Sequence, residues 1–242
     1  MRIDENGVIY FTNDIVDANT APSGDYSHNP SYEPESFETN LSKKIAEFDM
    51  DDWKLILVNK DNPLEADIEC ELKKFDGFEV DERIYDELKE MFSDAEKEGI
   101  YLNMASGYRN YNTQNYLYNK KVNYFKRLGF SKEEAEETAS MKVTPPMTSE
   151  HQTGLAVDIL SDDHYKMDAE FGESDAGIWL SEHSYEYGFI LRYPEGCEEI
   201  TKIQYEPWHF RYVGKDAAEF IYINNLTFEE FAEMVNTRNN SN

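Results

Sequence analysis

The sequence has few of the residues that build disulfide scaffolds, thiolate metal sites or nucleic-acid interfaces. Its two cysteines, Cys70 and Cys197, are too few for the first two, and they can pair only if the fold brings them together. Basic residues number 23 against 50 acidic ones, which gives a formal net charge of −27. Because nucleic-acid binding depends on clustered Lys and Arg, this charge argues against a nucleic-acid partner. It also predicts that any anionic group of a substrate is met by a specific local cation.

Membrane segments are lacking too. No apolar run reaches the roughly 18 residues that a membrane-spanning helix needs, so we expect no insertion of this chain into a bilayer. The first residues, Met1 to Gly7, are partly acidic and lack the apolar centre of a signal peptide. We therefore expect either a cytoplasmic protein or a chain from which a signal or anchor has been removed.

The chain has enough apolar material for a packed core, with 242 residues of which 40% are hydrophobic and 14% aromatic. Residues 1–45 differ from the rest, because the stretch 19–40 is rich in Ser, Pro, Asn and Glu and has neither a helical nor a strand period. We therefore divide the chain into a polar arm or linker, residues 1–45, and a globular domain, residues 46–242.

The globular part carries signals for both helices and strands. Apolar positions between 84 and 95 recur with helical spacing, and Gly99 follows them as a stop signal. Further helices are predicted over 113–128 and 174–187 and after two capping boxes, Ser131 with Glu134 and Thr227 with Glu230. Strands are predicted over 55–58, 100–104, 155–160, 189–192 and 208–213. Because helices and strands do not alternate regularly, the predicted fold class is α+β.

One candidate site lies in the stretch 149–158. His151 enters a turn that contains Gly154, and Asp158 follows on an otherwise apolar strand. A carboxylate among apolar residues is costly to bury unless something compensates its charge. Either Asp158 points to solvent, or it has a cationic or metal partner.

A second candidate lies in the stretch 206–214. His209 and Arg211 fall on one face of a predicted strand, and Glu206 precedes His209 by three residues. Taken alone, these could be a surface glutamate and a core histidine. Taken with the first stretch, they offer two imidazoles and a carboxylate as ligands and a second carboxylate nearby.

Such a set of three protein ligands is typical of catalytic zinc, which keeps one coordination position open. Non-haem Fe(II), which also uses two histidines and a carboxylate, is the alternative metal. The additional glutamate favours hydrolysis, because an attacking water needs a proton acceptor. No HExxH helix is present, which excludes a thermolysin-type arrangement.

A third stretch, 106–114, places Arg109 and Gln114 at a predicted strand-to-helix junction. In so acidic a chain, a cation at this position is a candidate for binding a carboxylate or an oxyanion. The alternative is an arginine in one of many surface ion pairs.

These three stretches together resemble the signatures of VanY-type D-alanyl-D-alanine carboxypeptidases, zinc peptidases of bacterial cell-wall peptides that include LD-carboxypeptidases. The resemblance covers about residues 53–225 and is carried by Ser106-Gly107-Tyr108-Arg109, Ser149-x-His151-x6-Asp158 and Glu206-x-Trp208-His209. It implies a small α+β domain of the hedgehog/D-Ala-D-Ala peptidase kind, whose antiparallel sheet floors a zinc-containing groove with helices packed on one side. Met147 and Lys202 stand where many members have glycine.

The resemblance also implies roles for individual residues. His151, Asp158 and His209 would hold one Zn²⁺ per chain. Glu206 would act as general base and then as acid, and Arg109 would hold the scissile carbonyl or the developing oxyanion. Gln114 and Ser149 would be substrate contacts.

The function implied is removal of a C-terminal D-alanine from peptidoglycan stem peptides, by D,D- or L,D-cleavage. A non-catalytic zinc-containing binding module of the hedgehog-like fold is the alternative, and an acidic interaction module without metal is a third. Retention of Glu206 and Arg109 favours the enzyme, since a scaffold needs neither. We expect a monomer that acts outside the cell or at its surface, because the polar arm suits a stalk, with a cytoplasmic enzyme as the alternative.

Overall fold

The structure is a computed structural model that describes residues 2–3, 9–10 and 43–239. The chain forms two units, Met1–Asn40 and Leu41–Asn242. In the first unit, strand β1 (Arg2–Ile3) pairs antiparallel with β2 (Ile9–Tyr10). Most of the predicted polar arm lies outside the described residues.

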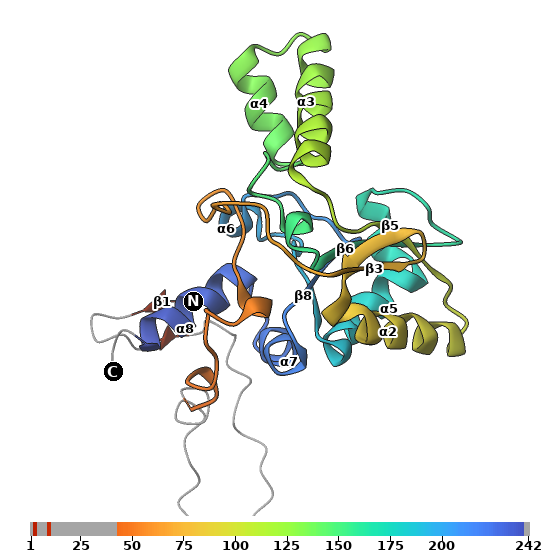
Figure 1. Cartoon of the computed structure of the whole chain (residues 1–242), viewed down its shortest axis with the longest axis vertical. Coiled ribbons are helices and arrows are strands. Elements are labelled where there is room, and N and C mark those ends of the chain that lie inside the picture. The colour runs from red at the N-terminus through yellow and green to blue at the C-terminus, as the bar shows by residue number, and fades with distance from the viewer. Residues whose placement is uncertain (1, 4–8, 11–42, 240–242) are drawn as a thin grey trace, which may run out of the picture. The chain divides into compact units, whose positions relative to one another are not determined.

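The second unit is organised around a four-stranded antiparallel sheet in the order β5-β6-β8-β7 (Figure 1). Its strands are β5 (Leu102–Ser106), β6 (Ala156–Ser161), β7 (Phe189–Leu191) and β8 (His209–Tyr212). The register places Asp158 of β6 opposite His209 of β8 on one side and opposite Ser106 of β5 on the other. The central strand β6 therefore brings together three segments that are far apart in the sequence.

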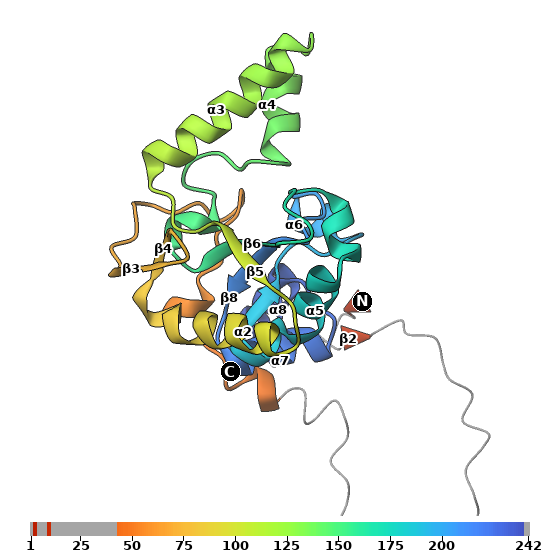
Figure 2. The same ribbon diagram turned by 90° about the vertical axis from the view of Figure 1, so that its right-hand side faces the viewer.

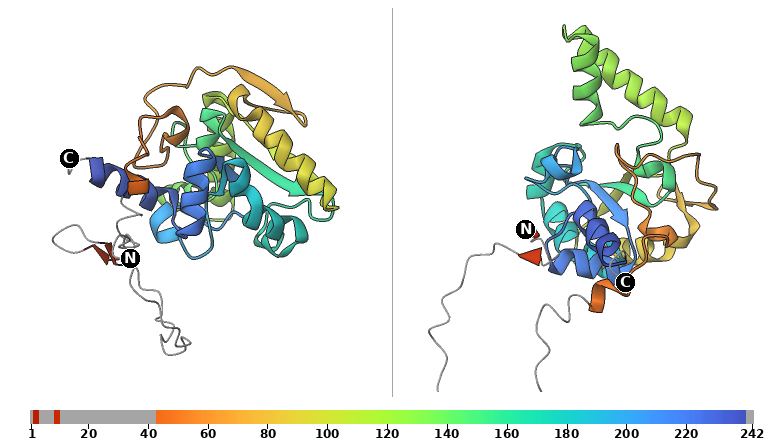
Figure 3. Two further views of the ribbon diagram at one scale, coloured as in Figure 1. Left: turned by 90° about the horizontal axis from the view of Figure 1, so that it is seen from below. Right: turned by 90° about the vertical axis from the view of Figure 1, so that its left-hand side faces the viewer.

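Helices cover one side of this sheet. In Figure 1 the helices α2 (Tyr85–Lys97), α5 (Asp175–His183) and α7 (Lys215–Ile223) lie below the sheet, on the side away from α3 and α4. The main core lies between these helices and the strands and contains Leu88, Met91, Val157, Ile159, Leu180 and Phe210. The last helix, α8 (Phe228–Asn239), lies near the C-terminal end of the chain, where the ribbon is darkest blue (Figure 3). It contacts α7 through the rings of Phe231 and Phe220, whose centroids are 5.8 Å apart.

A helical hairpin, α3 (Tyr111–Arg127) and α4 (Lys132–Ser140), projects from the sheet on the other side (Figure 2). Asn110 caps α3, and the predicted capping box of Ser131 and Glu134 opens α4. The two helices share a small core of their own, formed by Val122, Phe125, Ala135 and Ala139. The hairpin is therefore stabilised by its own packing as well as by its attachment to the body.

The remaining elements are short. They are the hairpin β3 (Leu72–Phe75) and β4 (Phe78–Asp81), the helix α6 (Glu198–Thr201) and the 3₁₀ helices η1 (Trp53–Leu55), η2 (Glu82–Ile84), η3 (Glu150–Thr153), η4 (Ala169–Glu173) and η5 (Ser184–Tyr187). The β3–β4 hairpin was not predicted from the sequence, although its turn, Asp76-Gly77, is a typical hairpin signal with both residues at positive φ.

The predicted strand over 55–58 is wrong. Leu55 ends a 3₁₀ helix, and residues 56–58 have no strand partner although Leu55 and Val58 are buried. The carbonyls of Lys54 and Ile56 instead accept hydrogen bonds from the Arg211 guanidinium, at 3.1 and 2.8 Å. A buried apolar run can thus satisfy its backbone with a side chain rather than with a neighbouring strand.

The predicted α+β class is confirmed, with an antiparallel sheet whose one side is covered by α2, α5 and α7, while the hairpin of α3 and α4 projects on the other side. Met147 and Lys202, the two positions where the resemblance predicts glycine, both adopt positive φ, 70° and 61°. Cys70 and Cys197 are free thiols. Within the described part of the chain, no helix has the length and apolar character needed to span a membrane.

Candidate metal centre and active site

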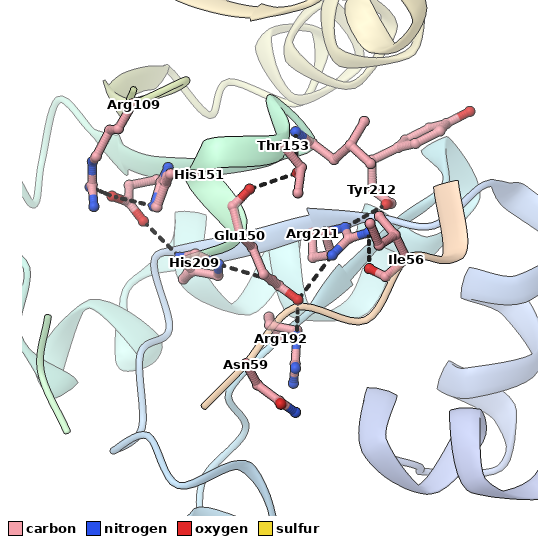
Figure 4. Close-up of polar contacts among 12 residues, drawn as sticks. Ile56, Asn59, Arg109, Glu150, His151, Thr153, Arg192, His209, Arg211 and Tyr212 are labelled. Atoms are coloured by element: carbon pink, nitrogen blue, oxygen red, sulfur yellow. Dashed lines mark hydrogen bonds and ion pairs between the residues drawn. The ribbon is translucent and has the colours of Figure 1, made fainter. Parts of the chain in front are cut away.

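Three potential metal ligands converge at the centre of the sheet. His151 comes from η3, Asp158 from β6 and His209 from β8, and one donor atom from each lies within 4.8 Å of the others. All three side chains are buried. The rings of the two histidines stand edge to face, with centroids 4.9 Å apart. The sequence segments that carry the predicted ligands are thus brought to one point (Figure 4).

The orientation of His151 is fixed by a backbone carbonyl. Its Nδ1 lies 2.8 Å from the carbonyl oxygen of Gly107, so Nδ1 carries the proton and Nε2 has a free lone pair. That Nε2 lies 3.3 Å from Oδ2 of Asp158. Gly107 is required here, because a Cβ at this position would lie 2.3 Å from the carbonyl oxygen of Glu79. Gly107 therefore allows its segment to approach the backbone of Glu79 closely, and this places the Gly107 carbonyl beside His151.

His209 lies between two carboxylates. Its Nδ1 is 3.1 Å from Oδ1 of Asp158, and its Nε2 is 3.5 Å from Oε2 of Glu150. Neither Nε2 of His209 nor Oε2 of Glu150 has another hydrogen-bond partner within the described residues. This arrangement places the Nε2 proton towards Glu150 and directs Nδ1 to the metal position.

Glu150 is held in turn by two buried arginines. Its Oε1 accepts hydrogen bonds from Nε of Arg192 at 2.8 Å and from Nη1 of Arg211 at 3.0 Å (Figure 4). Arg192 also donates to Glu229, at 2.8 Å. Neither Glu150 nor Arg192 was predicted from the sequence to belong to the site. The available signals were the position of Glu150 next to His151 and the position of Arg211 on the same strand face as His209.

Arg109 approaches the site from the loop before α3. Its Nη2 lies 2.9 Å from Oδ2 of Asp158, its Nε donates to Oγ of Ser106 at 3.0 Å, and its backbone N–H donates to the carbonyl of His151 at 3.0 Å. The Gln114 side chain lies 3.4 Å from Nη1 of Arg109 and donates to the carbonyl of Thr144 at 2.7 Å. Gln114 therefore supports Arg109, and its predicted contact with substrate stays a prediction.

Glu206, Ser149 and the metal-ligand set line one cleft of about 540 Å³. Glu206 is 8% exposed, and no hydrogen bond or ion pair within the described part of the chain engages its carboxylate. Its backbone N–H donates to the carbonyl of Tyr193 at 3.1 Å, which fixes the start of the turn into β8. The carboxyl group of Glu206 is thus available to a bound molecule, and so is Ser149 at the cleft wall.

Burial and neighbouring charges set the protonation states of the site. Burial raises the pKa of Glu206 to about 8, with the negative charge of Asp158 adding to the effect. Burial and then Arg109 lower the pKa of His151 to about 4. Burial alone would lower the pKa of His209, but hydrogen bonds with Asp158 and Glu150 outweigh it and raise the pKa to about 9. Burial opposes ionisation of Asp158 too, yet the two histidines and Arg109 hold its pKa well below the ordinary value.

The donor set suits a divalent ion. Two imidazole nitrogens and one carboxylate oxygen are ligands that zinc accepts, and each has a partner outside the cluster that orients it: Gly107 for His151, Glu150 for His209 and Arg109 for Asp158. His164 and His183 do not belong to this cluster and pair instead with Asp168 and Glu186, at 2.6 and 2.9 Å. His28 lies outside the described residues.

Comparison with known proteins gives the same assignment as the three motifs. The VanY family, described as D-alanyl-D-alanine carboxypeptidase, matches residues 77–215. A D-alanyl-D-alanine carboxypeptidase of Enterococcus faecalis is 40% identical over 195 residues, which cover 80% of this chain and 71% of the relative.

Solved structures agree. One is a mutant of the vancomycin resistance D,D-pentapeptidase VanY from a VanB-type resistance cassette, in complex with Zn(II). It is 42% identical to this chain with a TM-score of 0.68, and the match covers 75% of this chain and 99% of the VanY chain. The LD-carboxypeptidase LdcB is 38% identical with a TM-score of 0.62, over 74% of this chain and 86% of LdcB. The predicted resemblance is confirmed, and the chain belongs to the VanY family of D-alanyl-D-alanine carboxypeptidases.

Proposed function

We propose that the protein is a zinc-dependent carboxypeptidase that removes a C-terminal D-alanine from peptidoglycan stem peptides. The observation that carries the proposal is the convergence of His151, Asp158 and His209, within 4.8 Å of one another, in a cleft that also contains Glu206 and Arg109. Membership of a carboxypeptidase family favours this function over a non-catalytic zinc-containing module.

Zinc held by these three residues would polarise the scissile carbonyl and lower the pKa of an attacking water. Glu206 takes the proton of that water and returns it to the amine of the leaving D-alanine. In the metal-free protein, burial raises the pKa of Glu206 to about 8, and a carboxyl group whose pKa is raised towards neutrality is suited to accept and return a proton.

Arg109 stabilises the negative charge that develops on the scissile carbonyl oxygen. Its guanidinium is held by Ser106, Gln114 and Asp158, so it is ordered before substrate binds. Ser149 lines the same cleft and is available to contact the substrate backbone.

The relatives include a D,D-pentapeptidase and an LD-carboxypeptidase, so both D-Ala-D-Ala and L-Lys-D-Ala ends are candidate substrates. Such peptides occur in the cell wall, so we infer that the protein acts outside the cell or at its surface. We further propose that it acts as a monomer.

Mass spectrometry of synthetic muropeptides tests the proposal. Peptides with either end are incubated with the protein, with and without a chelator, and then with zinc restored. We expect loss of one D-alanine that stops with the chelator and returns with zinc, and the preferred end decides between D,D- and L,D-cleavage. Absence of D-alanine release from both peptides in the presence of zinc would refute the proposed function.

A further inference from the structure

The cleft does not end at the metal-ligand set. It extends along one face of α3, where Leu117, Lys120, Lys121, Tyr124 and Arg127 line it, and Lys142 lines it from the loop after α4. These α3 residues follow a helical spacing of three or four positions (117, 120 and 121, 124, 127), which places them on one side of the helix. We call Lys120, Lys121, Arg127 and Lys142 the cationic wall.

The cationic wall makes no ion pair within the described residues. The ammonium of Lys120 lies 6.0 Å from the Tyr116 ring centroid, Nε of Arg127 donates to the carbonyl of Asn123 at 3.3 Å, and Lys142 donates to the amide oxygen of Gln204. Ion pairs occur elsewhere on the hairpin, where Lys132 pairs with Glu136. The charge of Lys142 acts on Glu206, whose pKa it lowers slightly against the effect of burial. Lys120, Lys121 and Arg127 make no ion pair within the described residues, and in a chain with 50 acidic and 23 basic residues they form a positive surface on one cleft wall.

The distance from the reacting centre indicates which part of a substrate this surface meets. Gln114, in the first turn of α3, contacts Arg109. At about 1.5 Å per residue, Lys120 lies about 9 Å further along α3 and Arg127 about 20 Å. A single C-terminal residue cannot reach so far from the scissile bond. An extended peptide, at about 3.3 Å per residue, covers these distances with about three to six residues.

We propose that the cationic wall binds peptide carboxylates on the N-terminal side of the scissile bond, three or more residues before it. This inference rests on the proposed carboxypeptidase function and adds a substrate class to it, namely stem peptides with free carboxyl groups upstream. The acidic remainder of the protein repels such peptides at long range, so the wall also selects how they enter the cleft.

The test compares two synthetic peptides with the same C-terminal end, either D-Ala-D-Ala or L-Lys-D-Ala, whichever the protein cleaves faster. One carries acidic residues three to six positions before the scissile bond, and the other carries the corresponding amides. With wild-type protein and zinc at low salt, we expect the kcat/KM ratio of the acidic to the amide peptide to be about 10, mainly through KM, and to fall as salt is raised. In the K120Q/K121Q/R127Q variant, the ratio falls to about 1.

Lys126 is the matched control, because it is exposed on α3 but does not line the cleft. The K126Q variant should keep the wild-type ratio. A ratio of about 1 in wild type, or an unchanged ratio in the triple variant, would overturn the inference. If inorganic polyphosphate competes with hydrolysis in wild type while the two peptides are cleaved equally, the wall binds phosphate and the inference also fails. These outcomes still include D-alanine release, whereas failure of the proposed function means that neither peptide is cleaved.

Discussion

Glu150 lies directly behind His209, with 3.5 Å between its Oε2 and the Nε2 of the imidazole. The carboxylate is fully buried between Arg192 and Arg211, and their charges hold the pKa of Glu150 below its ordinary value. A carboxylate that accepts the outer N–H of a metal-ligating histidine fixes its tautomer and increases its basicity. The two arginines keep that carboxylate ionised in a buried position, so they act on the metal site through Glu150.

Glu150→Gln should therefore weaken zinc binding by about 10- to 100-fold, because the amide removes the negative charge beside Nε2 of His209. Competition with a chromophoric chelator measures the change. Glu229→Gln is the matched control, since Glu229 pairs with Arg192 but not with His209. It should lower thermal stability and leave zinc affinity near the wild-type value. Equal loss of affinity in both variants would contradict a specific role for Glu150.

Glu206→Gln should lower kcat by about 10²- to 10⁴-fold, because the amide cannot transfer a proton between water and the leaving amine. Zinc content should stay at one ion per chain, since Glu206 is not among the three predicted ligands. An assay of D-alanine release measures the loss of turnover, and atomic emission measures the zinc content. Wild-type turnover in this variant would remove Glu206 from the mechanism.

Arg109→Lys should lower kcat by about 10²- to 10³-fold while keeping a positive charge. The lysine cannot reproduce the fork that contacts Ser106, Gln114 and Asp158 together, so the cation is no longer held in place. Arg83→Lys is a suitable control, because Arg83 pairs with Asp81 and does not line the cleft. Similar kinetics of the two variants would show that the position of Arg109 is not used.

Lys202→Gly should stabilise the protein by up to about 1 kcal/mol, because Lys202 ends α6 with a φ of 61° that a side chain disfavours. Lys202→Ala, which keeps Cβ, should bring no such gain. Thermal unfolding of the two variants separates backbone strain from loss of the lysine side chain. Equal melting temperatures would mean that the strain at this position is negligible.

The sequence predicted that His151, Asp158 and His209 lie together, because the motifs place chemically distinctive residues on or beside strands with simple geometry. A carboxylate on the apolar strand 155–160 needed a compensating partner, and the structure places His151, His209 and Arg109 around Asp158. Glu150 lies in the 3₁₀ helix η3 rather than on a strand. A residue in a 3₁₀ turn has no fixed face that spacing can predict, so its burial between two distant arginines was visible only in the folded chain.

Other features depend on contacts across long separations in the sequence. The apolar run 55–58 looked like a strand, but its carbonyls are satisfied by Arg211, which lies more than 150 positions away. The cationic wall also depends on the placement of segments that are distant in the sequence. Lys120, Lys121 and Arg127 are ordinary polar positions of an amphipathic helix until the hairpin is placed beside the cleft.

Removal of the metal should make stability depend on His209 at alkaline pH. In the metal-free protein the pKa of His209 is raised to about 9, above its ordinary value of 6.5. A raised pKa means that the folded state favours the protonated ring, so this stabilisation is complete below about pH 6.5 and is lost as pH rises through about 9. The shift corresponds to about 3 kcal/mol. Zinc needs the neutral ring, so the bound form should lack this dependence.

Denaturant unfolding of metal-free and zinc-loaded protein between pH 6 and 10 measures the effect, and ring signals of His209 in NMR spectra assign it. We expect the midpoint of His209 near 9 without metal and no midpoint there with zinc. His151, whose pKa is about 4, should stay neutral across this range and serves as the internal control. A His209 midpoint near 6.5 in the metal-free protein would show that Asp158 and Glu150 do not hold the ring as the structure places them.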